Sequence, residues 1–112
     1  MKTKADNLLE RIHLGEDSFL ELKTVSVPGK RVAEPDSRDI ADEFAAAANT
    51  QGATFVFGVS DLTRQLVGID FAKLDIVETW VRDVCNDSIK PPLLATIRKQ
   101  SLVDSNGEPK SV

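Results

Sequence analysis

The chain contains only one cysteine, one histidine and no tyrosine among its 112 residues. Because a disulfide needs two cysteines, Cys85 cannot close a bond within the chain, and no cysteine–histidine cluster has the spacing of a zinc site. No apolar run is long enough to span a membrane, and the polar N-terminus lacks the apolar core of a signal peptide. These absences exclude disulfide-stapled and zinc-finger domains, and they predict a soluble protein of the reducing cytoplasm.

Aromatic residues are few, and the chain carries no net positive charge. Phe and Trp make up 5% of the chain, and the formal net charge at pH 7 is −4. Proteins that coat nucleic acid are usually basic, so this composition argues against a general nucleic-acid-coating protein. It still permits a local basic patch or a cluster of carboxylates that binds a metal. His13 has no Ser or Cys nucleophile signature beside it, and no glycine-rich phosphate-binding loop is present.

The hydrophobic pattern predicts one domain, residues 1–112, in which helices alternate with strands. Helices are expected from a cap at Asp6 to Gly15, from Arg38 to Asn49 after a cap at Asp36 or Ser37, and after a cap at Asp75. Strands are expected over residues 18–27, 54–59, 66–69 and 94–103. The expected fold class is α/β (α+β), with a mixed β-sheet of about four to six strands packed against two or three helices.

A strong turn signal lies close to the end of the sequence. Asn106-Gly107, within Ser105–Glu108, suits the type I′ turn of a β-hairpin. Little chain follows it for a partner strand, since the sequence ends at Val112. We therefore expect an exposed sheet edge, and we expect the domain to be the N-terminal part of a longer protein with further C-terminal domains.

Charged residues on the first predicted strand form the first candidate site. Glu21 and Lys23 are two apart, so they project from the same face of that strand. With Glu16 and Asp61 they make a candidate metal and catalytic set, because Mg²⁺ and Mn²⁺ prefer oxygen ligands and a lysine can steady a phosphate oxygen. Alternating Glu and Lys on an exposed strand also arise without function, through solvation and a weak ion pair. Spacing alone does not decide between these interpretations.

Polar and cationic residues around the second predicted helix form the other candidate site. Lys30, Arg31 and Arg38 surround the loop after the first strand, and Asn49 and Thr50 follow the helix. With Lys23, these residues are the candidate contacts to nucleic-acid phosphates. Asn and Gly at a helix end are also ordinary capping residues, and surface Lys and Arg are ordinary solubilising groups. No aromatic residues interleave with these cations, so base stacking is poorly supported.

Several short motifs occur in a fixed order along the chain. They are Glu21-Leu22-Lys23 after Glu16, Ala48-Asn49-Thr50-Gln51-Gly52 after Phe44, Gly58-Val59-Ser60-Asp61, and Val67-Gly68-Ile69. Together with Ile89-Lys90-Pro91, this ordered set resembles the Schlafen AlbA-2 domain family over most of residues 16–103. The sequence departs from the family's pattern at Ala53, where the family has a second glycine, and in its shortened closing strand.

The resemblance implies an α/β DNA-binding module that commonly heads a longer transcriptional regulator. In Schlafen proteins, related domains cleave structured RNA with an acidic triad. Glu16, Glu21 and Asp61 look like the counterparts of that triad, with Asp70 as an alternative to Asp61.

The resemblance and the local cations together favour a nucleic-acid-binding regulatory domain without a cofactor or catalytic activity. Its expected partners are DNA in preference to RNA and a second copy of the chain, with no membrane. Two alternatives stay open. One is a metal-dependent endoribonuclease that uses Mg²⁺ or Mn²⁺, and the other is a dimerisation or assembly module.

Overall fold

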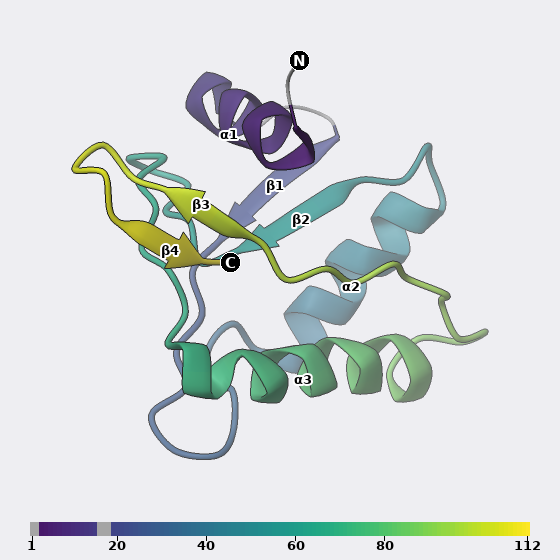
Figure 1. Cartoon of the computed structure of the whole chain (residues 1–112). Helices are drawn as coiled ribbons and strands as arrows, with labels where there is room; N and C mark the ends of the chain where they lie inside the picture. The colour runs from purple at the N-terminus through teal and green to yellow at the C-terminus, as the bar shows by residue number, and fades with distance from the viewer. Residues whose placement is uncertain (1–2, 16–18) are drawn as a thin grey trace.

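The computed structural model describes residues 3–15 and 19–112. Within these residues lie three α-helices, α1 (Lys4–Leu14), α2 (Ser37–Ala48) and α3 (Leu74–Asp87), together with the short 3₁₀ helix η1 (Phe71–Lys73). The strands are β1 (Leu20–Lys23), β2 (Thr54–Phe57), β3 (Ser101–Val103) and β4 (Pro109–Ser111). The chain is thus a mixture of α and β elements, as the sequence predicts (Figure 1).

The described strands form two small sheets. β1 and β2 pair in parallel, with Glu21 opposite Phe55 and Lys23 opposite Phe57, and α2 connects the two strands. β3 and β4 pair antiparallel as a hairpin. A single sheet of four to six strands is not confirmed, because each sheet among the described residues has two strands.

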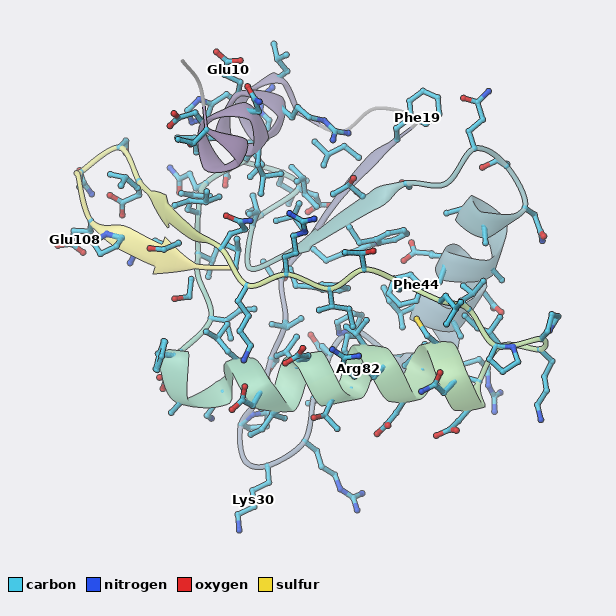
Figure 2. All side chains as sticks on the ribbon, turned by 45° about the vertical axis from the view of Figure 1, so that its right-hand side comes forward. Glu10, Phe19, Lys30, Phe44, Arg82 and Glu108 are labelled. Atoms are coloured by element: carbon cyan, nitrogen blue, oxygen red, sulfur yellow. The ribbon has the colours of Figure 1, made fainter. Side chains whose placement is uncertain are left out.

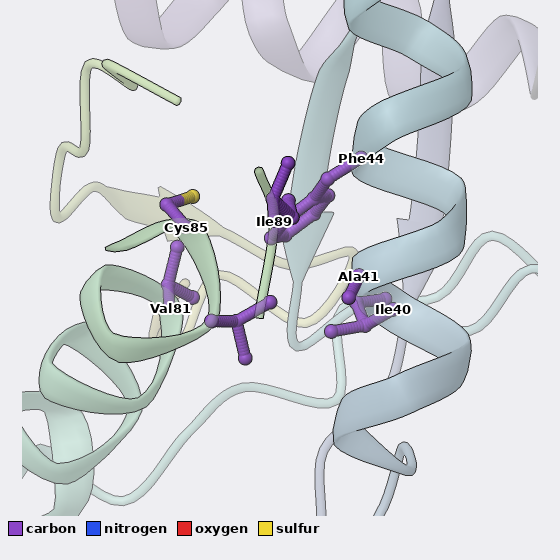
Figure 3. Close-up of a cluster of buried hydrophobic side chains, with 7 residues drawn as sticks. Ile40, Ala41, Phe44, Val81, Cys85 and Ile89 are labelled. Atoms are coloured by element: carbon purple, nitrogen blue, oxygen red, sulfur yellow. The ribbon is translucent and has the colours of Figure 1, made fainter. Parts of the chain in front are cut away.

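Two apolar clusters lie on opposite faces of the β1–β2 pair. Leu20 and Leu22 are fully buried on one face, where they pack in a cluster with Ile12 of α1 and Leu102 of β3. On the other face, α2 and α3 enclose a second cluster around Phe44 (Figure 3). The strand pair is therefore covered on both sides, by α1 and the hairpin on one side and by α2 and α3 on the other (Figure 1).

Capping explains where the helices begin and end. Asp36 caps α2, because its carboxylate accepts hydrogen bonds from the backbone N–H groups of Arg38 and Asp39. The predicted end of α1 at Gly15 is confirmed, but its N-cap is Thr3, and Asp6 completes a capping box from within the helix. Asp75 does not cap α3, since it lies in the first turn of a helix that follows directly from η1.

The strands are shorter than the sequence predicts. Residues 66–69 contribute only a single bridge, between Leu66 and Val59, and the segment expected to be a strand from Leu94 forms one only at Ser101–Val103. Leu93 and Ile97 instead pack against the cluster between α2 and α3. Their apolar side chains are therefore explained by this packing and not by pairing with a neighbouring strand. No helix in the described parts of the chain is long and apolar enough to cross a membrane.

The hairpin near the end of the chain corrects one expectation. Asp104 and Gly107 shape the turn, and β4 supplies the partner strand that appeared to be missing. Val112 extends the pairing, because it exchanges two backbone hydrogen bonds with Gln100, of 2.9 and 3.1 Å. Three residues suffice for this strand since Leu102, which is buried, anchors the hairpin in the cluster shared with α1.

Candidate functional site

Glu21 and Lys23 project from the face of β1 that α2 covers. Both side chains are partly buried, and the Nζ of Lys23 donates a hydrogen bond of 2.8 Å to the Oε1 of Glu43 on α2. The Lys23 and Glu43 side chains are 25% and 42% exposed, so water reaches this ion pair without fully surrounding it. The predicted polar face therefore exists, but it is a contact between a strand and a helix and not an open strand surface.

A shallow hollow of about 260 Å³ lies beside this contact. Glu21, Glu43 and Thr50 line it, and the remaining lining residues are Ala46, Ala47, Ala53 and Phe55. The small alanine side chains leave this space where α2 approaches the strands. The Thr50 hydroxyl donates a hydrogen bond of 2.9 Å to the Ala47 carbonyl oxygen, so it also caps the end of α2. The structure thus brings together two predicted site residues, Glu21 and Thr50.

Of the three carboxylates of the proposed metal triad, Glu21 and Asp61 lie within the described residues. Glu16 lies outside the described residues, and Asp61 is exposed in the turn that follows β2. The alternative residue, Asp70, caps η1 by accepting a hydrogen bond of 3.1 Å from the backbone N–H of Ala72. Among residues 3–15 and 19–112, no group of three or more His, Cys, Asp or Glu side chains lies close enough to hold a metal ion. The role of the triad therefore stays a prediction.

Lys30 and Arg31 are exposed in a loop that we call the basic loop, residues 27–33. Backbone hydrogen bonds between Ser26 and its partners Ala33 and Glu34 close the base of this loop. The Nζ of Lys73 also donates to the carbonyl oxygen of Val27, which ties the loop to the start of α3. The loop projects from the body of the molecule, and the Lys30 side chain points away from it (Figures 1 and 2).

α2 separates the predicted nucleic-acid contacts into two groups. Arg38 lies in its first turn, whereas Asn49 and Thr50 follow its last residue. The 12 residues of α2 give a length of about 18 Å at 1.5 Å per residue. Arg38 therefore lies near the end of α2 that follows the basic loop in the chain, while Asn49 and Thr50 lie at the opposite end, where Thr50 lines the hollow.

Arg38 is exposed next to a fixed contact between α2 and α3. The Nε1 of Trp80 donates a hydrogen bond of 2.8 Å to the hydroxyl oxygen of Ser37, the residue before Arg38. The Trp80 ring also packs edge-on against Phe57, with ring centroids 5.7 Å apart. Trp80 therefore links α3 to the start of α2 and to β2.

Glu43 is the site residue that the sequence analysis missed. It was overlooked because a glutamate in the middle of an amphipathic helix is usually a solvated residue. The sequence pattern that could have indicated Glu43 is its position four residues before Ala47, since residues at that spacing share a helix face. An alanine-rich helix face lies close to whatever it covers, so a carboxylate on that face was placed to reach Lys23.

Cationic residues late in the chain belong to a different surface. Lys99 donates to the Oδ1 of Asp75 and lies 3.5 Å from Glu78, whose other carboxylate oxygen accepts a 3.0 Å hydrogen bond from Arg82. The hydrogen bond to Asp75 raises the pKa of Lys99, and the hydrogen bond from Arg82 lowers the pKa of Glu78. Lys99 is thus already matched by carboxylates, and Lys90 and Arg98 are further exposed cations of this region.

A larger, mostly apolar groove of about 640 Å³ lies between β2, α3 and residues 93–100. Its lining includes Cys85, which is 4% exposed, and burial raises the pKa of this thiol. A thiol with a raised pKa carries little thiolate and is a poor nucleophile. The groove therefore contributes packing surface and no evident chemistry.

Comparison with known proteins places this geometry in a family. No curated protein and no solved structure matches the chain. The model of the family described as Schlafen, AlbA_2 matches residues 16–106, which include β1, the basic loop, α2 and β2. This match covers most of the chain, and the chain therefore belongs to the Schlafen AlbA_2 family.

Proposed function

We propose that this chain is a nucleic-acid-binding domain of a transcriptional regulator, with DNA preferred to RNA. The observation that carries the proposal is the projecting basic loop, in which Lys30 and Arg31 are exposed and the Lys30 side chain points away from the body of the molecule (Figure 2); Arg38, early in α2, is exposed as well. Membership of the Schlafen AlbA_2 family supports a nucleic-acid-related role. Asn49 and Thr50, which follow the last residue of α2, and Lys23, which forms an ion pair with Glu43, are proposed as secondary contacts.

A projecting loop explains how an acidic protein can approach a phosphate backbone. The net charge of −4 repels DNA at long range. At an ionic strength of 0.1 M, however, charges on the body of the protein are largely screened beyond about 10 Å. Cations at the tip of a loop that extends away from the body can therefore contact phosphates while the acidic surface stays at a distance.

The number of cations limits the affinity. If Lys30, Arg31 and Arg38 each neutralise one phosphate, the logarithm of the binding constant should fall with the logarithm of salt concentration at a slope of about −2.7. Such a shallow slope accompanies weak binding by a single copy. We propose that a homodimer, or further domains of a longer protein, supplies the additional contacts that a regulator needs.

A fluorescence titration of labelled 20-base-pair duplex DNA over a salt series tests the proposal. Replacing both loop cations, by Lys30→Glu with Arg31→Glu, should abolish binding. The matched control makes the same change of charge elsewhere, by Lys90→Glu with Arg98→Glu, and should retain most of the affinity. Equal losses in the two double variants, or a wild-type affinity that does not change with salt, would contradict the proposal.

The hollow favours a second candidate, a metal-dependent nuclease. Glu21 and Glu43 both line it, and Lys23 lies next to Glu43. In this alternative Glu16, Glu21 and Asp61 bind Mg²⁺ or Mn²⁺, and Lys23 stabilises the scissile phosphate. Cleavage of a labelled hairpin RNA with and without Mn²⁺ tests it. The candidate requires metal-dependent cutting that disappears in Glu21→Gln, and cutting that survives this substitution rules out the assigned role of Glu21.

A further inference from the structure

Lys23 lies shortly before the basic loop in the chain and pairs with Glu43 of α2. Lys23 is the last residue of β1, and the chain passes from it through the bridge at Ser26 directly into the loop that carries Lys30. Lys23 is therefore the last cation that precedes the basic loop in the chain. It is held at 2.8 Å by the carboxylate of Glu43, which comes from a different element, α2.

The surroundings strengthen this ion pair relative to one on the open surface. Phe55 and Phe57, the register partners of Glu21 and Lys23, are partly buried on the same face, and Phe55 packs edge-on against Phe44 at 4.8 Å between ring centroids. Apolar neighbours reduce solvent screening, so the attraction between the two charges exceeds that of an exposed pair. A phosphate that approaches Lys23 must compete with the Glu43 carboxylate and is also repelled by it.

We infer that Glu43 is an internal competitor for the proposed phosphate contact of Lys23, and that it thereby limits the affinity of the domain for DNA. This inference rests on the proposed function. It assigns to Glu43 a role opposite to that of the loop cations, because removing its charge should tighten binding. It also predicts that Lys23 contributes little to DNA binding while Glu43 is present, although a lysine beside a nucleic-acid interface would ordinarily contribute directly.

A double-mutant cycle with duplex DNA tests the inference. Glu43→Gln keeps the size of the side chain and removes its charge, and we expect it to raise the affinity about tenfold, which corresponds to 1.4 kcal/mol. It should also steepen the salt dependence by about −0.9, the value for one additional phosphate contact. Lys23→Met should cancel most of this gain when it is added to Glu43→Gln, and it should lower the affinity of the wild type much less than it lowers that of Glu43→Gln.

The control for general charge repulsion is Asp42→Asn. Asp42 is the exposed neighbour of Glu43 on α2, so this substitution makes the same change in net charge without touching Lys23. We expect less than about a twofold gain from it, because surface charges are screened by salt. Circular dichroism of each variant checks that the helices are retained.

The outcomes separate the inference from the proposed function. Wild-type binding with an unchanged Glu43→Gln affinity overturns the inference and leaves the proposed function standing. A gain in Glu43→Gln that persists after Lys23→Met also overturns it, since repulsion alone would then explain the effect. If neither the wild type nor Glu43→Gln binds duplex or single-stranded DNA or hairpin RNA at low salt, the proposed function and the inference both fail.

Discussion

The two faces of the β1–β2 pair are both covered, yet they carry different chemistry. One face presents Leu20 and Leu22, which are fully buried under α1 and the β3–β4 hairpin. The other presents Glu21 and Lys23, which are partly buried where α2 crosses the strands. Because side chains alternate along a strand, four residues supply both a core and a polar site. The core face fixes the register, and the register in turn fixes where the charges lie.

Removing a core side chain should have the largest effect. Leu22→Ala deletes a fully buried side chain, and we expect it to lower the free energy of unfolding by about 2–5 kcal/mol. Lys23→Met, on the adjacent residue and the opposite face, should change it by less than about 1 kcal/mol. Urea denaturation followed by circular dichroism measures both. Similar losses in the two variants would mean that the two faces do not differ in the way proposed.

The aromatic cluster under α2 should show an intermediate effect. Phe44 is 8% exposed and meets Phe55 and Phe57 edge-on, at 4.8 and 6.5 Å between ring centroids. Phe44→Leu conserves most of the volume but loses these ring contacts, so we expect a destabilisation of about 1–2 kcal/mol. Phe71→Leu, at a side chain that is 81% exposed, should stay within about 0.5 kcal/mol in the same denaturation assay. A larger effect at Phe71 would contradict this ranking.

The contrast between the faces also separates what the sequence could predict from what it could not. Alternation along β1, the Asp36 cap and Gly15 are local signals, and the elements they predict are present. Lys23 and Glu43 are 20 residues apart, and their contact depends on how α2 lies across β1, which no local pattern specifies. For the same reason, one strand was expected over residues 94–103, whereas Ile97 packs on a neighbouring cluster and only Ser101–Val103 pair as a strand.

Weakening the cap of α2 tests how far the polar face depends on that helix. The Oδ1 of Asp36 accepts a 2.8 Å hydrogen bond from the backbone N–H of Arg38. We expect Asp36→Ala to cost about 1 kcal/mol of unfolding free energy. Asp42→Ala, at an exposed position in the middle of the helix, should change stability by only a few tenths of a kcal/mol, because alanine favours helix. Thermal and urea unfolding should rank the two variants in the same order. Equal losses of unfolding free energy in Asp36→Ala and Asp42→Ala would show that the cap has no special role.

The smallest effect should come from the ion pairs of Glu78 on α3, whose cations Arg82 and Lys99 are 58% and 45% exposed, whereas Lys23 is 25% exposed. The hydrogen bond from Arg82 is the main cause that lowers the pKa of Glu78, with a smaller contribution from Lys99. A carboxyl with a lowered pKa adds stability at neutral pH, and this contribution is lost as the pH falls below about 4.3, the ordinary glutamate value, through the lowered pKa.

Arg82→Met should therefore raise the pKa of Glu78 toward its ordinary value and make stability less dependent on pH in this acidic range. Lys99→Met should raise the same pKa less, because the hydrogen bond from Arg82 remains. An NMR titration of the Glu78 carboxyl carbon measures both shifts, and 1 M salt should reduce them, since the Debye length is then about 3 Å. A larger shift in Lys99→Met than in Arg82→Met would reverse the assigned order of the two partners. If 1 M salt leaves the two shifts of the Glu78 pKa unchanged, the ion pairs of α3 are not weak, solvent-screened surface contacts. The proposed contrast with the Lys23–Glu43 pair would then be wrong.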